Sequence, residues 1–372
     1  MKKVIDKNTI LAVILFAAGL GCYILNGQIQ ASFVVAILLF VAGLVLLIKG
    51  GDWFVDGASA IAEKFHVPEL LIGATVVSIG TTLPEVMVSS SAALKGNSGI
   101  SYGNAIGSII CNVALIAAIT ISCKPSKVDK KPLRIPVIVF FIAAIYYSLT
   151  AYLTGQFDRV NGIILLALFV GYMVVVIMQA VSENKKAMAE KAALSENADA
   201  KASSPASEEA GKEDEMPIAK AIILLVFGAA IIAFGATLLV DNGTIIATSL
   251  GVPDSVVALT FVALGTSLPE LVTAITSLIK GKGALSLGNI IGANIFNIVL
   301  VSGMAITLQP FEIPSEKTIA GMNSSLVIDI PLMLFVMAFL TLPALIKGKL
   351  YRWQGIILLL IYAGFCALQF VL

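Results

Sequence analysis

The sequence predicts an all-α polytopic membrane protein built from inverted repeats of five transmembrane helices each, plus one extra N-terminal helix, about eleven spans in total. The first observation behind this is composition. Hydrophobic residues are 58% of the 372 and charged residues only 13%, with a mean hydropathy of +0.99, whereas soluble domains carry roughly 25% charged residues. The second is an internal repeat. Residues 67–115 align without a gap with 252–300, and 19 of these 49 positions are identical.

The individual spans follow from the apolar stretches, because a helix needs about 20 residues to cross a bilayer. We expect spans at 9–26, 32–62, 70–94, 101–122, 134–152, 160–181, 217–246, 254–279, 286–307, 325–346 and 353–371. The repeat offset pairs the second to sixth spans with the seventh to eleventh. Since five is odd, the second repeat enters the membrane from the opposite side, and the two repeats are inverted.

The chain divides into an extra N-terminal helix, a first repeat, a linker and a second repeat, at 1–31, 32–182, 183–216 and 217–372. Lys2, Lys3 and Lys7 would also suit a signal peptide, but no clear cleavage site follows, so a retained helix is favoured. The linker is rich in Ala, Glu, Lys and Ser and contains no Phe, Tyr, Trp, Ile or Val. Such a segment buries too little apolar surface to order itself, so we expect it to be disordered.

Basic residues predict the orientation. With the N-terminus and the linker in the cytoplasm and the C-terminus outside, twenty Lys and Arg residues fall on inside segments. Only Lys95, Arg159 and Lys317 fall outside. We therefore expect a multi-pass protein of the cell membrane, plasma or inner. The net charge of +1 argues against a nucleic-acid partner, and no obligatory protein partner is evident.

Each repeat carries one glutamate deep in an apolar stretch. The phrase GTTLPE at 80–85 returns as GTSLPE at 265–270, which places Glu85 and Glu270 inside spans. An acidic residue at the centre of a span costs about 2.5–3.5 kcal/mol, so such residues usually serve a function. A protonated or hydrogen-bonded structural carboxyl group is the alternative for either residue. The preceding proline frees a backbone carbonyl one turn earlier in each copy, and a cation is one partner for it.

The surrounding residues add neutral oxygens. Ser78, Thr81 and Thr82 precede Glu85, and Ala263, Thr266 and Ser267 precede Glu270. Carboxylates, hydroxyls and carbonyls are hard ligands that suit Ca²⁺ or Na⁺. Any single hydroxyl has an equally good alternative, which is to bond back to its own helix.

A second repeated element follows, with the pattern GNxxG at 103–107 and 288–292. Its glycine spacing is typical of closely packed membrane helices. Asn112 and Asn297 follow it, and their amides can add oxygens without charge.

Matched glycines recur on the first helix of each repeat, Gly43 with Gly228 and Gly50 with Gly235. Such smooth stripes could let these helices slide across the core, and ordinary tight packing is the alternative.

Other chemistries lack support. Four scattered cysteines and one histidine do not make a zinc or copper site. There is no nucleophile–base constellation and no phosphate-binding loop, so neither an enzyme nor an ATP-driven pump is expected, and no cofactor is implied.

These residues resemble those of the calcium/cation antiporter superfamily, the sodium/calcium exchangers of prokaryotic type, over nearly the whole chain from about residue 32. The resemblance implies two inverted sets of five helices and a secondary active antiporter that exchanges Ca²⁺ for Na⁺ by alternating access at a midplane site. It implies cation ligation by both glutamates, by side-chain oxygens of seven further residues and by the backbone carbonyls of Ser78 and Ala263. The side-chain oxygens are those of Thr81, Thr82, Ser108, Asn112, Thr266, Ser267 and Asn297. The implied metal-site residues are Glu85, Glu270, Thr81, Thr82, Ser78, Ser108, Asn112, Ala263, Thr266, Ser267 and Asn297.

Two positions depart from the family pattern. Ala293 stands where a serine is frequent, which would weaken one sodium position. Asn297 stands where many relatives have aspartate, which argues against potassium co-transport.

A proton/calcium exchanger is the main alternative. That branch typically has GNxxE, however, and Gly107 and Gly292 occupy the glutamate positions here. A cation channel is disfavoured, because inverted repeats around one buried site suit alternating access better than a continuous pore.

Overall fold

The computed structural model describes residues 33–125, 127–199, 216–250, 265–314, 318–319 and 321–371. Within these residues the chain is almost wholly helical, and nine helices are long and apolar enough to cross a membrane. The all-α polytopic fold is confirmed. The total of eleven spans stays a prediction, because the expected span at 9–26 and much of that at 254–279 lie outside the described residues.

The first half runs through α2 (Phe33–Lys64), α3 (Glu69–Ile72), η1 (Gly73–Val77), α4 (Ser78–Leu94), α5 (Ser98–Cys111), η2 (Asn112–Ala117), α6 (Ala118–Cys123), α7 (Lys130–Thr154), β1 (Gln156–Phe157) and α8 (Arg159–Asp199). The second half runs through α9 (Ile218–Ser249), α12 (Leu268–Ile279), α13 (Gly283–Phe296), η4 (Asn297–Ser302), α14 (Gly303–Leu308), β2 (Phe311–Glu312), β3 (Thr318–Ile319), β4 (Met322–Asn323), η5 (Ser325–Asp329), α15 (Ile330–Lys347) and α16 (Arg352–Val371). Elements labelled η are π-helical turns within longer helices. The turns η2 and η4 occupy equivalent positions of the two repeats.

The turn after each glutamate-bearing helix has the same cause in both repeats. Gly96 and Gly281 end these helices with φ of 74° and 76°. Residues with a Cβ rarely adopt this left-handed conformation, and glycine adopts it freely. Asn97 then caps α5, because its Oδ1 accepts a hydrogen bond from the Ile100 N–H at 3.1 Å. The identical Lys-Gly pairs at 95–96 and 280–281 therefore encode equivalent hairpins.

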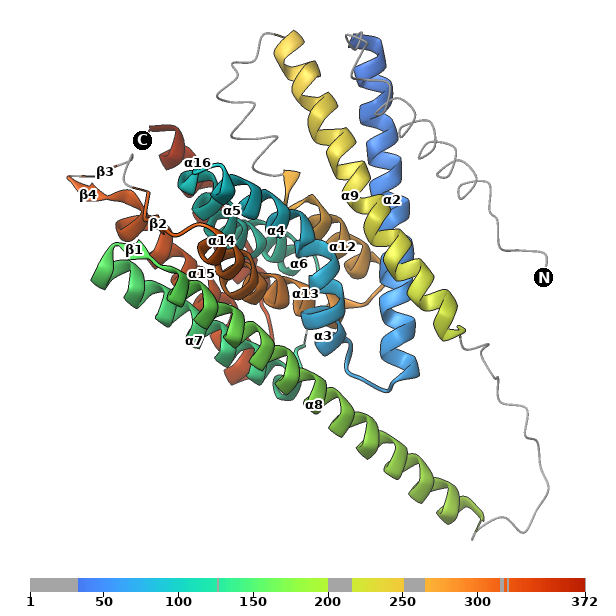
Figure 1. Cartoon of the computed structure of the whole chain (residues 1–372). Helices are drawn as coiled ribbons and strands as arrows, with labels where there is room; N and C mark the ends of the chain where they lie inside the picture. The colour runs from blue at the N-terminus through green and yellow to red at the C-terminus, as the bar shows by residue number, and fades with distance from the viewer. Residues whose placement is uncertain are drawn as a thin grey trace.

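The helices α2 and α9 form a long pair that stands beside the remaining bundle (Figure 1). Their matched glycines face one another. A Cβ at Gly43 would lie 2.9 Å from the Gly235 carbonyl oxygen, and one at Gly228 would lie 2.6 Å from the Phe54 nitrogen. The idea that these stripes slide on the core is wrong for these four positions. They bring the two helices into close contact, and α2 meets the core through other residues.

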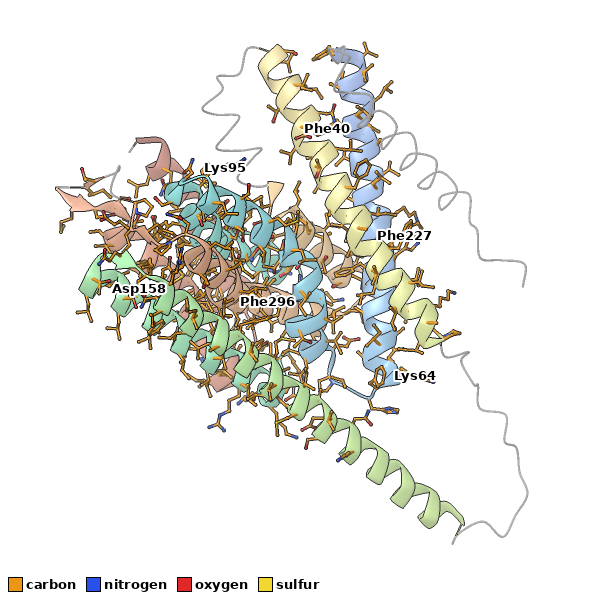
Figure 2. All side chains as sticks on the ribbon, in the orientation of Figure 1. Phe40, Lys64, Lys95, Asp158, Phe227 and Phe296 are labelled. Carbon is orange, nitrogen blue, oxygen red and sulfur yellow. The ribbon has the colours of Figure 1, made fainter. Side chains whose placement is uncertain are left out.

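The apolar core lies among α5 to α7, α13, η4 and α15. Phe296 is fully buried and lies near the middle of this bundle in Figure 2, while Lys64 and Lys95 lie toward opposite ends of the molecule. This arrangement surrounds η2 and η4 with packed side chains and holds both in fixed positions.

The expected disorder from residue 183 onward is wrong for its first part, because α8 continues as a helix to Asp199. The sequence there is rich in Ala, Glu and Lys, which have high helix propensity, so a helix already started in the membrane continues past its end. Residues 200–215 and the extra helix at 1–31 lie outside the described residues. The expected domain boundaries accordingly stay predictions.

Candidate cation site

The two repeated glutamates are the most deeply buried charged residues in the described structure. Glu85 lies in α4 and Glu270 in the first turn of α12, and both are 0% exposed. Their carboxyl groups are close enough to repel each other electrostatically. Two buried like charges are costly unless a cation or protons compensate for them.

The local backbone differs between the two copies. Pro84 lies inside α4, which continues through it without a break. In the second repeat the chain turns at 266–267, and α12 begins only at Leu268, with Pro269 in its first turn. Glu270 therefore sits at a helix N-terminus, where free N–H groups and the helix dipole favour a negative charge.

Hydrogen bonds join the repeats crosswise with matching geometry. The Thr81 hydroxyl donates to Asn289 Oδ1 at 3.2 Å, and the Thr266 hydroxyl donates to Asn104 Oδ1, also at 3.2 Å. Each threonine precedes its glutamate by one turn, and each asparagine belongs to the opposite repeat. Each repeat therefore orients the other repeat's threonine.

Eight oxygen atoms of the two glutamates and of four other predicted site residues lack hydrogen-bond partners among the described residues. All four carboxyl oxygens are buried and unpartnered, and so are one hydroxyl and one amide oxygen from each repeat. These neutral atoms are Thr82 Oγ1, Ser267 Oγ, Asn112 Oδ1 and Asn297 Oδ1. Most buried polar groups in proteins have a partner. Eight unpartnered oxygens in symmetric pairs have the composition of a hard-cation site.

Each π-helical turn packs against the glutamate-bearing helix of the other repeat. Asn112 begins η2, which packs against α12, and Asn297 begins η4, which packs against α4. Each asparagine thus lies on a segment that contacts the helix carrying the other repeat's glutamate. π-Helical turns are frequent at functional sites, because the inserted residue redirects the side chains near it.

The remaining predicted residues have more ordinary settings. The Ser78 hydroxyl lies 2.8 Å from the Gly73 carbonyl and 3.0 Å from that of Asn289, so it bonds to backbone. Ser108 is buried on α5, at 5% exposure. Ala263 lies outside the described residues.

Three residues that sequence reasoning missed contribute to this region. Asn104 Nδ2 donates to the Glu85 carbonyl at 3.1 Å and to Ser89 Oγ at 2.8 Å. Asn289 is the equivalent residue of the second repeat, and their place in the repeated GNxxG phrase was the available signal. Asn294 accepts from Asn112 Nδ2 at 3.1 Å. Its repeat counterpart is an isoleucine, so nothing in the repeat indicated it.

Gly292 lies where the chain has no space for a side chain. A Cβ there would lie 2.6 Å from Ala74 Cα and 2.7 Å from the Ala74 carbonyl oxygen, and closer still to Ser78 Oγ. The second-repeat helix α13 therefore packs directly on η1. A carboxylate at position 292 is incompatible with this packing.

The described residues contain no group of three or more His, Cys, Asp or Glu side chains suited to a metal. Within these residues, Glu85 and Glu270 are therefore not part of a larger cluster of such side chains.

Comparison with known proteins gives a consistent family. The family model "Sodium/calcium exchanger protein" matches residues 35–178 and 220–371. The sodium/calcium exchanger MaX1 of Methanosarcina acetivorans is 30% identical, with 88% of this chain and 96% of that protein covered. An uncharacterized membrane protein of Methanocaldococcus jannaschii is 32% identical, with 86% and 92% covered. Among solved structures, the sodium-calcium exchanger NCX_Mj soaked with Na⁺ and Sr²⁺ superimposes with a TM-score of 0.68 at 30% identity, covering 89% of this chain and 98% of that one.

Proposed function

Because this chain belongs to the sodium/calcium exchanger family, we propose that it is a secondary active antiporter that exchanges Ca²⁺ for Na⁺ at a site formed by Glu85 and Glu270. Ca²⁺ and Na⁺ are its transported substrates, and the proposal requires no resident cofactor and no chemical step. It describes a transporter rather than an enzyme, as the family's named members are exchangers.

One observation carries the proposal: one fully buried glutamate comes from each repeat, and the carboxyl oxygens of both are unpartnered. Two carboxylates balance the charge of one Ca²⁺. Thr82, Ser267 and the two asparagines supply the neutral oxygens that raise the coordination number toward the six to eight that Ca²⁺ takes.

Exchange follows from competition for these ligands. The same carboxylates attract Na⁺, and Ca²⁺ and Na⁺ that share ligands cannot all bind together. A site emptied of cations keeps two repelling charges in a dry interior, which is costly. The protein therefore favours states in which one kind of cation or the other is bound, and this preference couples the two fluxes.

The packing at Gly292 supports sodium over protons as the counter-ion. A proton exchanger of the related branch would carry glutamate at positions 107 and 292. Ala74 and Ser78 occupy the space that a side chain at 292 would need, whereas a Cβ at Gly107 would meet no described atom within 4 Å. Asn297 stands where many relatives have aspartate, and the missing carboxylate argues against potassium co-transport.

Alternating access requires part of the molecule to move. We assign this movement to the α2–α9 pair, which the close contacts at its glycines make a single unit. Lysines next to α12 hold α2 to the core: Lys280 Nζ lies 2.7 Å from Asp56 Oδ1 and donates to the Asp52 carbonyl at 2.9 Å. These contacts are polar and partly exposed, so they can exchange for water at modest cost. From the bias in basic residues, we expect this end of the molecule to lie on the cytoplasmic side of the cell membrane.

A flux assay tests the proposal. Membrane vesicles loaded with Na⁺ should take up radioactive Ca²⁺ when diluted into Na⁺-free medium, and Glu85→Gln or Glu270→Gln should abolish the uptake. Glu312→Gln is the matched control, because it removes a carboxylate from the exposed strand β2. Near-normal uptake in either site variant would refute the assigned roles. Uptake driven by a proton gradient without Na⁺ would favour the proton/calcium alternative.

A further inference from the structure

We propose that a cavity at the end of α12 and α13 that we expect in the cytoplasm is a binding site for a phosphate group, supplied by an anionic lipid headgroup or by free phosphate. Its volume is about 210 Å³, and it lies among the ends of α6 and α12, the start of α13 and the loop before α16. The inference concerns binding alone and stands apart from the exchange activity.

The charge of the cavity lining is positive. Lys124 and Lys127 line it, and none of the residues that line it is acidic. Neither lysine forms an ion pair within the part of the chain that the structure describes, whereas Lys131, Lys280 and Lys282 each pair with a carboxylate. Two uncompensated ammonium groups at a membrane surface attract phosphate, and they repel the cations that an ion pathway would need to pass.

The position of Lys127 is fixed by the fold. Its backbone pairs with that of Lys349 in an isolated antiparallel bridge, and the next residue, Val128, donates its N–H to the Gly348 carbonyl at 2.9 Å. The loop between α15 and α16 therefore holds Lys127 over the cavity, and Leu350 of the same loop closes one side.

The floor of the cavity offers uncapped backbone N–H groups. The helix α13 starts at Gly283, and its N-cap residue, Lys282, makes no side-chain capping bond. Gly283 and Ala284 of its first turn line the cavity. A Cβ added at Gly281 or Gly283 would meet no described atom within 4 Å. A helix N-terminus with unobstructed N–H groups favours phosphate through its dipole and its free donors.

A buried hydroxyl provides the independent observation. Ser286 lines the cavity at 3% exposure, and its Oγ has no hydrogen-bond partner. A serine in a membrane helix often donates to the carbonyl four residues earlier, which can accept this bond in addition to the helical N–H bond. Ser286 Oγ makes no such bond to the Lys282 carbonyl and has no other partner among the described residues. A phosphate oxygen in the cavity would supply one.

The test measures binding by the purified full-length protein. Its thermal midpoint is recorded against increasing dioctanoyl-phosphatidylglycerol or dioctanoyl-phosphatidylcholine. In a separate arm it is recorded against sodium phosphate or sodium chloride at equal ionic strength. A ligand that binds only the folded state raises the midpoint with its concentration, which gives an apparent Kd. We expect phosphatidylglycerol, but not phosphatidylcholine, to raise it. If phosphate also raises it, the site accepts the free ion; if it does not, the source is the lipid headgroup.

Matched variants locate the site. Lys124→Gln/Lys127→Gln should weaken binding roughly 20–30-fold, from about 1 kcal/mol for each lysine. The control Lys347→Gln/Lys349→Gln removes the same charge from the same surface at side chains that do not line the cavity, and lie instead over the Tyr351 ring. It should change binding by less than about threefold.

The variant Ser286→Ala leaves net charge and lysines unchanged. We expect about tenfold weaker binding, since a hydrogen bond to a charged group contributes about 1.5–3 kcal/mol. Equal losses in the two double variants would show a diffuse surface attraction and overturn the proposal. So would unchanged binding by Ser286→Ala, or no response of the wild-type protein to either phosphate-bearing ligand.

Discussion

The contact between α13 and η1 gives a sharp prediction, because Gly292 leaves no room for even one methyl group. Gly292→Ala places a Cβ 2.6 Å from Ala74 Cα and 2.7 Å from the Ala74 carbonyl oxygen. Carbon atoms pack at about 3.5–4.0 Å, so the two helices must separate by roughly 1 Å. Both neighbours belong to backbone, which cannot rotate away.

Forcing an extra methyl group into a packed interior costs about 1–3 kcal/mol. For domains of 150–250 residues, each kcal/mol lowers the thermal midpoint by about 2–4 °C, so we expect a decrease of several degrees. Transport should fall as well, because α13 leads directly into η4 and carries Asn297 with it. The measurements are the thermal midpoint of the purified protein and Na⁺-driven Ca²⁺ uptake into vesicles.

Gly171→Ala is the control for this substitution. Gly171 lies in α8, and a Cβ there would meet no described atom within 4 Å. Alanine favours a helix over glycine by up to about 1 kcal/mol, so this variant should be as stable as the wild type or slightly more so. A Gly292→Ala protein that melts and transports like Gly171→Ala would refute the close approach of α13 and η1.

Three further substitutions have definite expected outcomes. Lys280→Gln removes the ion pair with Asp56, and because this pair is partly exposed the free energy of unfolding should fall by less than about 1 kcal/mol. The turnover rate of uptake should change more than the Ca²⁺ concentration for half-maximal uptake. An unchanged turnover rate would exclude a role for this contact in the movement of the α2–α9 pair. Asn104→Ala and Asn289→Ala each remove the acceptor of a crosswise bond from a threonine. Asn104→Ala also removes the donor to the Glu85 carbonyl, and Asn289→Ala also removes an acceptor 3.3 Å from the Ser78 hydroxyl. Both variants should therefore lower Ca²⁺ uptake, and unchanged uptake in either would contradict a role for its crosswise bond. Asn297→Asp adds a third carboxylate, which should tighten Ca²⁺ binding in a competition assay, and weaker binding would place Asn297 outside the ligand set.

The sequence alone predicted most of the helices, because long apolar stretches and an exact 185-residue offset constrain one another. The helix at 101–122, for instance, is observed at 98–123 as α5, η2 and α6. The π-helical turns within it could not be predicted. They arise when a residue is accommodated by tertiary packing rather than by local propensity.

The burial of both glutamates was predictable from the sequence, whereas the hydrogen bonds around them were not, and the role of these residues as cation ligands stays a prediction. Placing both glutamates in the interior required only their position in apolar stretches. Ser78, by contrast, bonds to the Gly73 and Asn289 carbonyls, and Asn104 links Glu85 to the other repeat. Such contacts depend on how helices from different repeats meet, and composition and spacing do not contain that information. The expected disorder of the linker was wrong at residues 183–199, because a segment of low hydrophobicity can still have enough helix propensity to extend a helix that begins in the membrane.

The crosswise bonds Thr81–Asn289 and Thr266–Asn104 bear on how such a molecule could have arisen. Neither half, taken separately, supplies the asparagine that accepts the hydrogen bond of its own threonine, and each half contributes one of the two buried glutamates. An ancestral gene that encoded a single half would have been useful only if two copies of its product had inserted in opposite directions and met face to face. Fusion of the duplicated gene would then have preserved a contact that already existed, and the later divergence of the halves accounts for features, such as Asn294, that only one of them has.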